Sequence, residues 1–454
     1  MLTCFGPLHE WIHVAVPISI QWQHQGTPID TNPMSEQSSK EEEEEEERLL
    51  VKITWNNTQP PSYYDLKWLS KWRYDDRAIA KRRSKTEITT SSLQRIIDYD
   101  DDNDSIGGML RFDYDILHNN NNNNQEEGVY QLLDALFTNG AILITNAPTN
   151  PTIVPHIASL LSYPSSLSHG ALYGDTFNVI SSPDAHNIAY TSFPLRAHQD
   201  LAYYESFPGL QILHCLQNGN GIQGGESLLI DALAAAYAFR AIVEEDVFRV
   251  LVQTECTFVK QREGASMTYN RPHVVLKQHH HHGHDDGLNG EIVAVNWSPP
   301  FEGPPVFSSS SDVELYYAAY HAFQLILNND NYDYITMDDS SSLYKYISKE
   351  QLRLCKDYAK QYTWERKLQP GEMLIFNNRR MLHGRRGFQH AAKKTNIDKS
   401  NDDCETGYYE RHFKGGYTCM DDTLNRYRTM KRDRHNDDDG GAICNVGHGT
   451  TLVP

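Results

Sequence analysis

The sequence is poor in cysteine: its 454 residues include 7, and no two form a Cys-x-x-Cys pair. Disulfide scaffolds need paired cysteines and structural zinc sites use closely spaced ones, so neither class is expected. No run approaches the ~18 consecutive apolar residues that a membrane helix needs, so we expect no membrane span. Basic residues number 41 against 60 acidic ones, which gives a net charge of −19. Such a surface repels phosphate backbones, so nucleic acid is not an expected partner.

The amino terminus lacks the marks of a targeting segment. Residues 1–23 contain no Lys or Arg, unlike a secretory signal or an Arg-rich mitochondrial transit peptide. The scattered, odd-numbered cysteines favour a reducing compartment. We therefore expect a cytoplasmic location, and mitochondrial import stays open.

Changes in composition divide the chain into four parts. Seven consecutive glutamates close the first part and six consecutive asparagines lie in the second, and such polar runs favour a solvated chain. Within the second part, LLVKITW predicts a strand and the spacing of Leu66, Leu69 and Trp72 predicts a helix. The four predicted parts are a disordered acidic N-terminus (1–47), a small module with an Asn/Asp-rich linker (48–128), the main domain (129–430) and a polar tail (431–454).

The main domain is predicted to be mainly β. A helix pattern from Val129 stops at Gly140 and is followed by a buried strand, Ala141 to Thr145. Beyond it lie short β-like runs punctuated by Gly and Pro, interrupted by one strong helix pattern at 312–329. This pattern predicts a sandwich or barrel with peripheral helices. The predicted strands are GLQILHCL, SLLIDAL, VLVQTECTFV, EIVAVNW and EMLIFNN, and the polar insertions are 278–290 and 390–407.

A candidate metal site lies in His198-Gln199-Asp200, with His383 directly after a strand-like run. Two His and one carboxylate form the facial triad of Fe(II) oxygenases, which leaves open positions for substrate and oxygen. In a strand, residues i and i+2 point to one side, so His198 and Asp200 are expected to reach one ion together. A distant strand across the barrel would supply His383. The competing interpretation is an exposed strand, because the chain has 21 His.

Seven ordered motifs resemble the gamma-butyrobetaine dioxygenase and trimethyllysine dioxygenase family, within the taurine-dioxygenase superfamily of Fe(II)/2-oxoglutarate oxygenases. The resemblance covers about residues 129–430 well and 48–90 faintly. It implies a double-stranded β-helix (jelly-roll) core with peripheral helices. The motifs are LYGDTF, NIAYT, HQD, PGLQILHCL, GGESLLIDAL, LIFNNRRMLHGRRGF and RHFKGGYTCMDDTLNRYR.

The resemblance assigns roles residue by residue. It implies that His198, Asp200 and His383 bind the iron and act as the catalytic centre. Arg411 matches the arginine that binds the distal carboxylate of 2-oxoglutarate, a task that suits a bidentate guanidinium. Ser227 is a weaker cofactor candidate. The alternative for Arg411 is a surface salt bridge, and its competitors are Arg379, Arg380, Arg385 and Arg386.

The resemblance also implies an aromatic cage for a trimethylammonium group, since a quaternary ammonium attracts ring faces and donates no hydrogen bond. Phe177 stands where the family usually has tryptophan. The alternative is simple core packing. The cage positions are Tyr173, Phe177, Tyr190 and Tyr417, with Asn187 and Asn296 as polar substrate contacts.

Two features depart from the family pattern. Leu201 follows the His-x-Asp motif where gamma-butyrobetaine dioxygenase has tyrosine, and the zinc-binding cysteines of the family's N-terminal domain are absent, so no zinc is expected. The run of His at 279–284 reads as a solvated insertion.

The expected protein is an Fe(II)- and 2-oxoglutarate-dependent dioxygenase that uses O2, with ascorbate as a supporting reductant. Its expected substrate is a small molecule, gamma-butyrobetaine converted to L-carnitine, and a homodimer is left open. The alternatives are trimethyllysine, another small substrate, a catalytically inactive binding protein and a zinc hydrolase.

Overall fold

The computed structural model describes residues 17–24, 49–55, 62–65, 77, 105–106, 109–117, 122–162, 175–180, 191–219, 221–262, 264–277, 288–328, 342–390 and 411–434. The chain divides into two units, Met1–Ile88 with Arg432–Pro454, and Thr89–Lys431. Among the described residues, no helix combines the length and apolar character needed to cross a bilayer.

The first unit contains an antiparallel sheet of order β1-β2-β3. Strand β2 (Leu49–Trp55) confirms the strand predicted from LLVKITW. It pairs with β3 (Ser62–Asp65) and with β1 (Pro17–His24). Strand β1 lies in the segment predicted to be disordered, so that prediction is wrong for Pro17–His24. Its alternation of apolar and polar residues, Ile18, Ile20 and Trp22, is a strand pattern. The glutamate run and the residues Leu66, Leu69 and Trp72 of the predicted helix lie outside the described residues.

The second unit is built on a seven-stranded sheet of order β4-β5-β6-β18-β9-β21-β7. All its pairs are antiparallel except β5 with β6. Since β5 precedes Val129, the main domain begins earlier than the predicted boundary. The strands are β4 (Ser105–Ile106), β5 (Met109–Asp113), β6 (Ala141–Thr145), β7 (Phe177–Ile180), β9 (Leu210–Asn218), β18 (Met373–Asn377) and β21 (Arg411–Tyr417).

A smaller sheet has the order β17-β11-β19-β8. Its strands are β8 (Leu195–His198), β11 (Ser227–Asp231), β17 (Trp364–Arg366) and β19 (Met381–Arg385). One buried cluster joins the two sheets: Leu143, Leu374 and Phe376 from the large sheet contact Leu229 and Met381 from the small one. The two sheets therefore enclose a common core, as the strand-rich sequence predicts.

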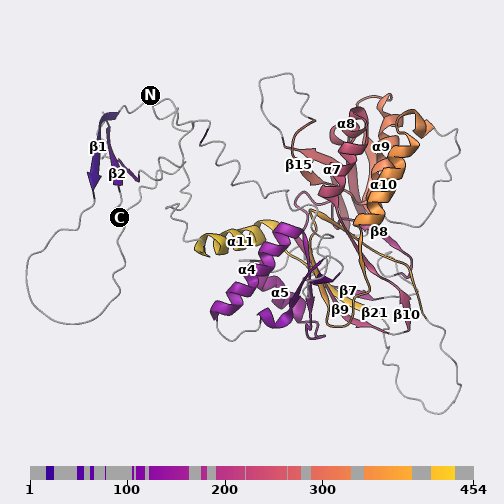
Figure 1. The fold of residues 1–454 in the computed structure, drawn as a ribbon, viewed down its shortest axis with the longest axis horizontal. Helices are drawn as coiled ribbons and strands as arrows, with labels where there is room; N and C mark the ends of the chain where they lie inside the picture. Colours follow the sequence, from indigo (N-terminus) through magenta and orange to yellow (C-terminus); the bar gives the residue numbers. More distant parts are fainter. Residues whose placement is uncertain are drawn as a thin grey trace, which may run out of the picture. The chain divides into compact units, whose positions relative to one another are not determined.

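Helices cover the outer faces of both sheets (Figure 1). Helices α4 (Asn122–Asn139), α5 (Ile153–Leu161) and α11 (Met420–Arg434) share an apolar cluster with β6, β9 and β18. On the other side, α7 (Ala232–Ile242), α8 (Glu245–Gln253), α9 (Asp312–Ile326) and α10 (Lys349–Tyr362) share an apolar cluster with Ile230 and Leu382 of the small sheet. Helix α9 confirms the predicted helix. The strand expected at 250–259 is instead the end of α8 followed by β12.

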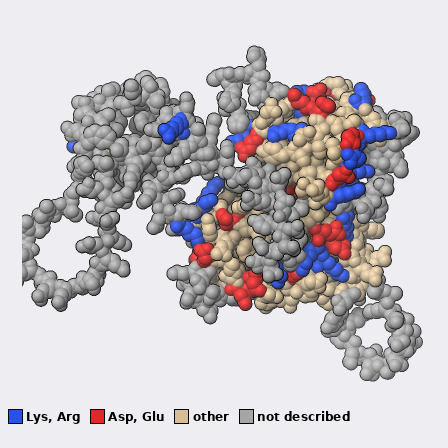
Figure 2. Space-filling model, in the orientation of Figure 1, with Lys and Arg blue, Asp and Glu red and all other residues tan. Residues whose placement is uncertain are grey.

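Smaller elements complete the unit. They are β10 (Ile222–Gly224), β12 (Glu255–Arg262), β13 (Ala265–Pro272), β14 (Val274–Leu276), β15 (Ile292–Val295), β16 (Glu302–Val306), β20 (Phe388–His390) and the 3-10 turns η3 (Tyr114–Leu117), η5 (Pro299–Phe301) and η6 (Ser342–Lys345). They pair as β13-β12-β16, β14-β15 and β10-β20. On the face shown in Figure 2, basic and acidic side chains are interspersed rather than gathered by sign.

Candidate active site

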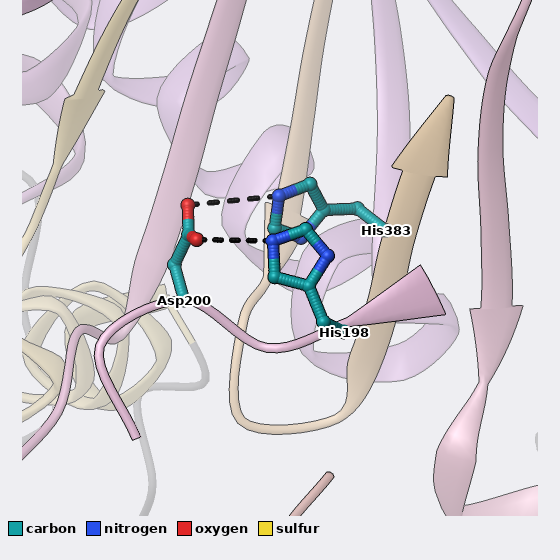
Figure 3. A group of neighbouring side chains, drawn as sticks. All are labelled: His198, Asp200 and His383. Atoms are coloured by element: carbon teal, nitrogen blue, oxygen red, sulfur yellow. Dashed lines mark ion pairs between the residues drawn. The ribbon is translucent and has the colours of Figure 1, made fainter. Parts of the chain in front are cut away.

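The pairing of β8 with β19 brings two histidines together. His198, the last residue of β8, lies directly opposite His383 of β19, and their ring centroids are 4.4 Å apart. Asp200 follows in the turn after β8. Its Oδ1 lies 3.3 Å from His198 Nε2 and its Oδ2 lies 3.6 Å from His383 Nε2 (Figure 3). The three predicted ligands therefore converge, with their ligand atoms within 4.8 Å of one another.

The elements that carry Asp200 and His383 differ from the predicted ones. Asp200 does not share a strand with His198, because β8 ends at His198 and the carboxylate comes from the turn. His383 comes from the neighbouring strand of the same sheet rather than from across the barrel. The three residues lie together as predicted, but the i, i+2 argument for that convergence was wrong.

Gly384 makes the close approach of these two strands possible. A Cβ at this position would lie 2.7 Å from the Leu195 carbonyl oxygen and 3.1 Å from the Ala197 amide nitrogen. Both atoms are backbone and cannot turn away as a flexible side chain could. The glycine directly after the distal histidine thus lets β8 place His198 against His383.

The two histidines of this site are buried and Asp200 is partly buried. His198 Nδ1 donates to the Arg196 carbonyl oxygen at 2.8 Å, and its Nε2 faces Asp200. Burial lowers the pKa of His383 to about 3, which keeps its ring neutral. Burial alone would raise the pKa of Asp200, but His383, His198 and the Tyr417 hydroxyl hold it below its usual value. The site thus brings two imidazoles and one carboxylate to a common point.

Neighbouring side chains fix the turn that carries Asp200. The Asp200 amide donates to Asn378 Oδ1 at 3.0 Å, and Asn378 Nδ2 donates back to the Asp200 carbonyl at 3.0 Å. Gln211 Nε2 and the Tyr417 hydroxyl each donate to Asp200 Oδ2 at 2.8 Å. Leu201 has a φ of 60°, a left-handed conformation that a branched side chain rarely adopts. The paired amide contacts of Asn378 stabilise this unfavourable turn.

Sequence reasoning missed Asn378 and Gln211. Both are fully or almost fully buried polar residues, but their partners lie 178 and 11 positions away. The available signal was weak: Gln211 is the polar residue in the otherwise apolar start of β9, and Asn378 follows β18 within Asn-Asn-Arg-Arg. Buried polar groups need partners, yet the sequence does not show which positions are buried.

Arg411 lies at the start of β21 with only 4% of its surface exposed. Its Nε and Nη1 have no hydrogen-bond partner among the described residues. Burial, with the charge of nearby Arg385, lowers the pKa of Arg411 to about 9. A buried guanidinium with unused donors is costly unless an anion binds it. The arginine is therefore suited to a carboxylate ligand.

The competing arginines are engaged in the protein itself. Arg380 donates through Nε and Nη2 to Asp231, the residue that caps α7. Arg379 donates to the Phe207 carbonyl, and Arg386 pairs with Glu365.

Arg385 donates from Nη2 to the carbonyls of Thr191 and Phe193. Its guanidinium and that of Arg411 lie 4.9 and 5.4 Å from the ring centre of Phe388. Ser227 lies opposite Arg385 in the β11–β19 ladder. The arginine pair and Ser227 therefore approach one another from three strands.

Two of the four predicted cage residues lie among the described residues, and they are in contact. Phe177 of β7 stacks on Tyr417 of β21, with ring centroids 5.0 Å apart and planes at 30°. Gly415 makes room for this stack, because a Cβ there would lie 2.3 Å from the Phe177 ring. Tyr173, Tyr190 and Asn187 lie outside the described residues.

Asn296 is buried, and its side-chain amide donates to the Pro272 carbonyl at 2.7 Å. Its backbone amide donates to the His273 carbonyl. These contacts are to the protein itself, and its assignment as a substrate contact stays a prediction.

Two imidazoles, one carboxylate and a buried arginine with unused donors are the groups expected at the site of an Fe(II)- and 2-oxoglutarate-dependent dioxygenase. The donor set fits Fe(II), and Arg411 fits a terminal carboxylate. Comparison with known families agrees. The chain belongs to the taurine catabolism dioxygenase TauD, TfdA family, whose profile matches residues 111–397.

Characterised relatives are similar at modest identity. Dioxygenase str8 of Strobilurus tenacellus is 26% identical over 67% of this chain and 60% of its own length. Gamma-butyrobetaine dioxygenase of Pseudomonas sp. is 25% identical over 84% of this chain and 78% of its own. Trimethyllysine dioxygenase of Meyerozyma guilliermondii is 22% identical over 74% and 73%. The chain thus spans less than two thirds of the Strobilurus relative. A taurine dioxygenase structure from Burkholderia xenovorans aligns with a TM-score of 0.36 and 14% identity, over 64% of this chain and 81% of that one.

Proposed function

We propose that this dioxygenase hydroxylates a small trimethylammonium compound, with gamma-butyrobetaine, giving L-carnitine, as the first candidate. Trimethyllysine is the second candidate, and another small substrate the third. Two of the relatives above carry these substrates in their names.

The proposal rests on Phe177 and Tyr417, whose rings stack on one another beside the proposed metal ligands. The Tyr417 hydroxyl donates to Asp200, so its ring lies next to the position where iron would bind. A substrate held there would lie against this aromatic stack. Ring faces attract a quaternary ammonium, whereas a sulfonate or carboxylate at that place would need basic donors.

Each part of the site has a role in this reaction. Iron and 2-oxoglutarate supply the oxidising chemistry when bound. His198, Asp200 and His383 would hold the metal by one face. Arg411 would bind the distal carboxylate of 2-oxoglutarate and fix its orientation. Tyr417 would both orient the Asp200 carboxylate and form part of the substrate wall.

The proposed function also implies a particular fold, the double-stranded β-helix. The seven- and four-stranded sheets share one core and are antiparallel apart from β5 with β6. We take them as the two halves of a double-stranded β-helix, with His198 and His383 on the small sheet, Asp200 in the turn after β8 and Arg411 on the large sheet. This arrangement would place the cosubstrate between the sheets.

Calorimetry with a redox-inert divalent metal in place of iron tests the cage. The ligands are gamma-butyrobetaine, trimethyllysine and a neutral tert-butyl isostere of gamma-butyrobetaine. A desolvated cation–π contact is worth up to about 2 kcal/mol, so the isostere should bind about tenfold more weakly or worse.

Variants of one ring make the test specific. Phe177→Leu should weaken binding of the charged ligand more than that of the isostere. Phe177→Trp should strengthen it, because indole is the stronger ring. Phe193→Leu is the matched control, since that phenylalanine is 69% exposed. Equal affinity for charged and neutral ligands, or equal effects of the Phe177 and Phe193 changes, would remove the cage from the proposal.

A further inference from the structure

A second group of metal-ligating side chains lies outside the active site, on the sheet β13-β12-β16 and the segment that follows β13. Cys256 comes from β12, His273 follows β13, and Glu302 begins β16. The thiol, one imidazole nitrogen and one carboxylate oxygen lie within 4.8 Å of one another. Cys256 is 1% exposed and His273 is fully buried, while Glu302 is partly buried. Their separation in the sequence hides the cluster from any search for spaced cysteines.

The imidazole of His273 presents a lone pair to this cluster. Its Nδ1 lies 2.9 Å from the Asn296 carbonyl oxygen, so the hydrogen is assigned to Nδ1 and the lone pair to Nε2. Burial lowers the pKa of His273, which keeps the ring neutral. Histidines that bind metals commonly donate their other nitrogen to a backbone carbonyl in this way. The hydroxyl of Tyr316 lies 2.8 Å from Nε2.

The cluster also carries negative charge. Glu302 receives hydrogen bonds from the Tyr320 hydroxyl at 2.6 Å and from the Ser298 amide at 3.3 Å, and both donors are neutral. Burial, with the charge of Glu302, raises the pKa of the Cys256 thiol to about 12. Without a cation the thiol therefore keeps its proton beside an acceptor-rich pocket. A divalent cation would offset the carboxylate charge and displace the thiol proton into solvent.

We propose that Cys256, His273 and Glu302 form a second metal site for a borderline divalent cation of the zinc class. Thiolate, imidazole and carboxylate are the three ligand types of tetrahedral Zn²⁺. The Tyr316 hydroxyl, 2.8 Å from Nε2, would give up its hydrogen bond to that nitrogen when the metal binds. The ligand set differs from that of the iron site by the sulfur, which favours Zn²⁺ over Fe(II).

Hydrogen bonds connect this site to the iron ligands. Asn296, whose carbonyl receives the His273 hydrogen bond, is followed by Trp297 and Ser298. The Gln199 amide donates to the Trp297 carbonyl at 2.8 Å, and the Trp297 amide donates to Gln199 Oε1 at 3.0 Å. The Ser298 hydroxyl donates to the Gln199 carbonyl at 2.7 Å. Since Gln199 lies between His198 and Asp200, a metal here would hold in place the segment that supports the iron ligands.

Cobalt spectroscopy of the full chain tests the site. The parent protein carries His198→Ala and His383→Ala, which removes the iron site, and is titrated with Co²⁺. The account predicts one equivalent of Co²⁺ with a thiolate-to-metal charge-transfer band in the near ultraviolet. Imidazoles alone give no such band, so cobalt held by the histidine run at 279–284 would not produce it.

Matched thiol variants identify the ligand. Cys256→Ser should abolish the band. Cys355→Ser should retain it, because Cys355 is also buried with a thiol pKa raised to about 12 but lies outside the cluster. If Cys256→Ser fails to fold, Glu302→Gln keeps the thiol and should weaken Co²⁺ binding. Zn²⁺ should raise the melting temperature of the parent and not that of Cys256→Ser. A parent without the band, or a band that survives Cys256→Ser, overturns the proposal.

Discussion

Replacing Arg411 with lysine separates the charge of the side chain from its geometry. Arg411 is almost fully buried, and its Nε and Nη1 lack partners among the described residues. In the proposed complex both groups donate to one carboxylate of 2-oxoglutarate. Lysine keeps a positive charge but cannot reproduce the planar fork.

The expected loss follows from these two donors. A hydrogen bond to a charged group contributes about 1.5–3 kcal/mol, and the substitution removes at least one of them. The Kd for 2-oxoglutarate should therefore rise about 10- to 100-fold. Because burial already lowers the pKa of Arg411 to about 9, a lysine there should also lose part of its charge near neutral pH. Binding to the variant should then weaken further as the pH rises from about 7 to about 9.

The measurement is calorimetric binding of 2-oxoglutarate with a redox-inert metal in the iron site. Arg386→Lys is the control, because that guanidinium pairs with Glu365 near the surface, and its Kd should not change. An unchanged Kd for Arg411→Lys would move the cosubstrate anchor to another residue, with Arg385 as the first to examine. Equal losses in both variants would mean that the substitutions act through stability.

Three further predictions concern the metal ligands and a buried histidine. Alanine at His198, Asp200 or His383 should abolish turnover while far-ultraviolet circular dichroism stays unchanged, and normal rates from any of the three would refute its assignment as a ligand. Asn378→Leu removes both contacts to the Asp200 backbone and should weaken metal binding about tenfold in a chelator competition. An unchanged metal affinity would show that the turn carrying Asp200 keeps its conformation without Asn378. Burial lowers the pKa of His214 from 6.5 to about 4, so between about pH 7.5 and about pH 5 the unfolded chain binds a proton that the folded chain does not, which should cost about 2 kcal/mol of unfolding free energy. Urea unfolding of His214→Leu should lack that loss, and an equal loss in the variant would contradict the reasoning.

The sequence predicted that His198, Asp200 and His383 lie together because this ligand set is distinctive and because the motifs around it are ordered along the chain. It also predicted β2, β6 and α9, whose apolar periodicity is strong. The strand expected at 250–259 is correct only from Glu255 onward, and its first residues end helix α8. A run of Val and Leu suits a buried helix as well as a strand. The domain boundary was placed too late because β5 is short and flanked by polar residues.

The geometry around Asp200 could not be predicted in the same way. Asn378 acts on a backbone 178 positions earlier, and nothing local to Asn378 indicates that partner. The left-handed φ of Leu201 is equally hidden, because leucine is an unusual residue for it. The cluster of Cys256, His273 and Glu302 depends on the register of β12 with β13 and β16. Contacts set by sheet pairing appear only when the strands are in place.

Succinate release is the most direct test of 2-oxoglutarate turnover on a trimethylammonium substrate. The protein, Fe(II), ascorbate and 2-oxoglutarate are incubated in air with gamma-butyrobetaine, trimethyllysine or taurine, and succinate and hydroxylated product are quantified together. The account predicts succinate and product in equal amounts with a trimethylammonium substrate, and little of either with taurine. Release with taurine alone, or no release with any of the three, would contradict it.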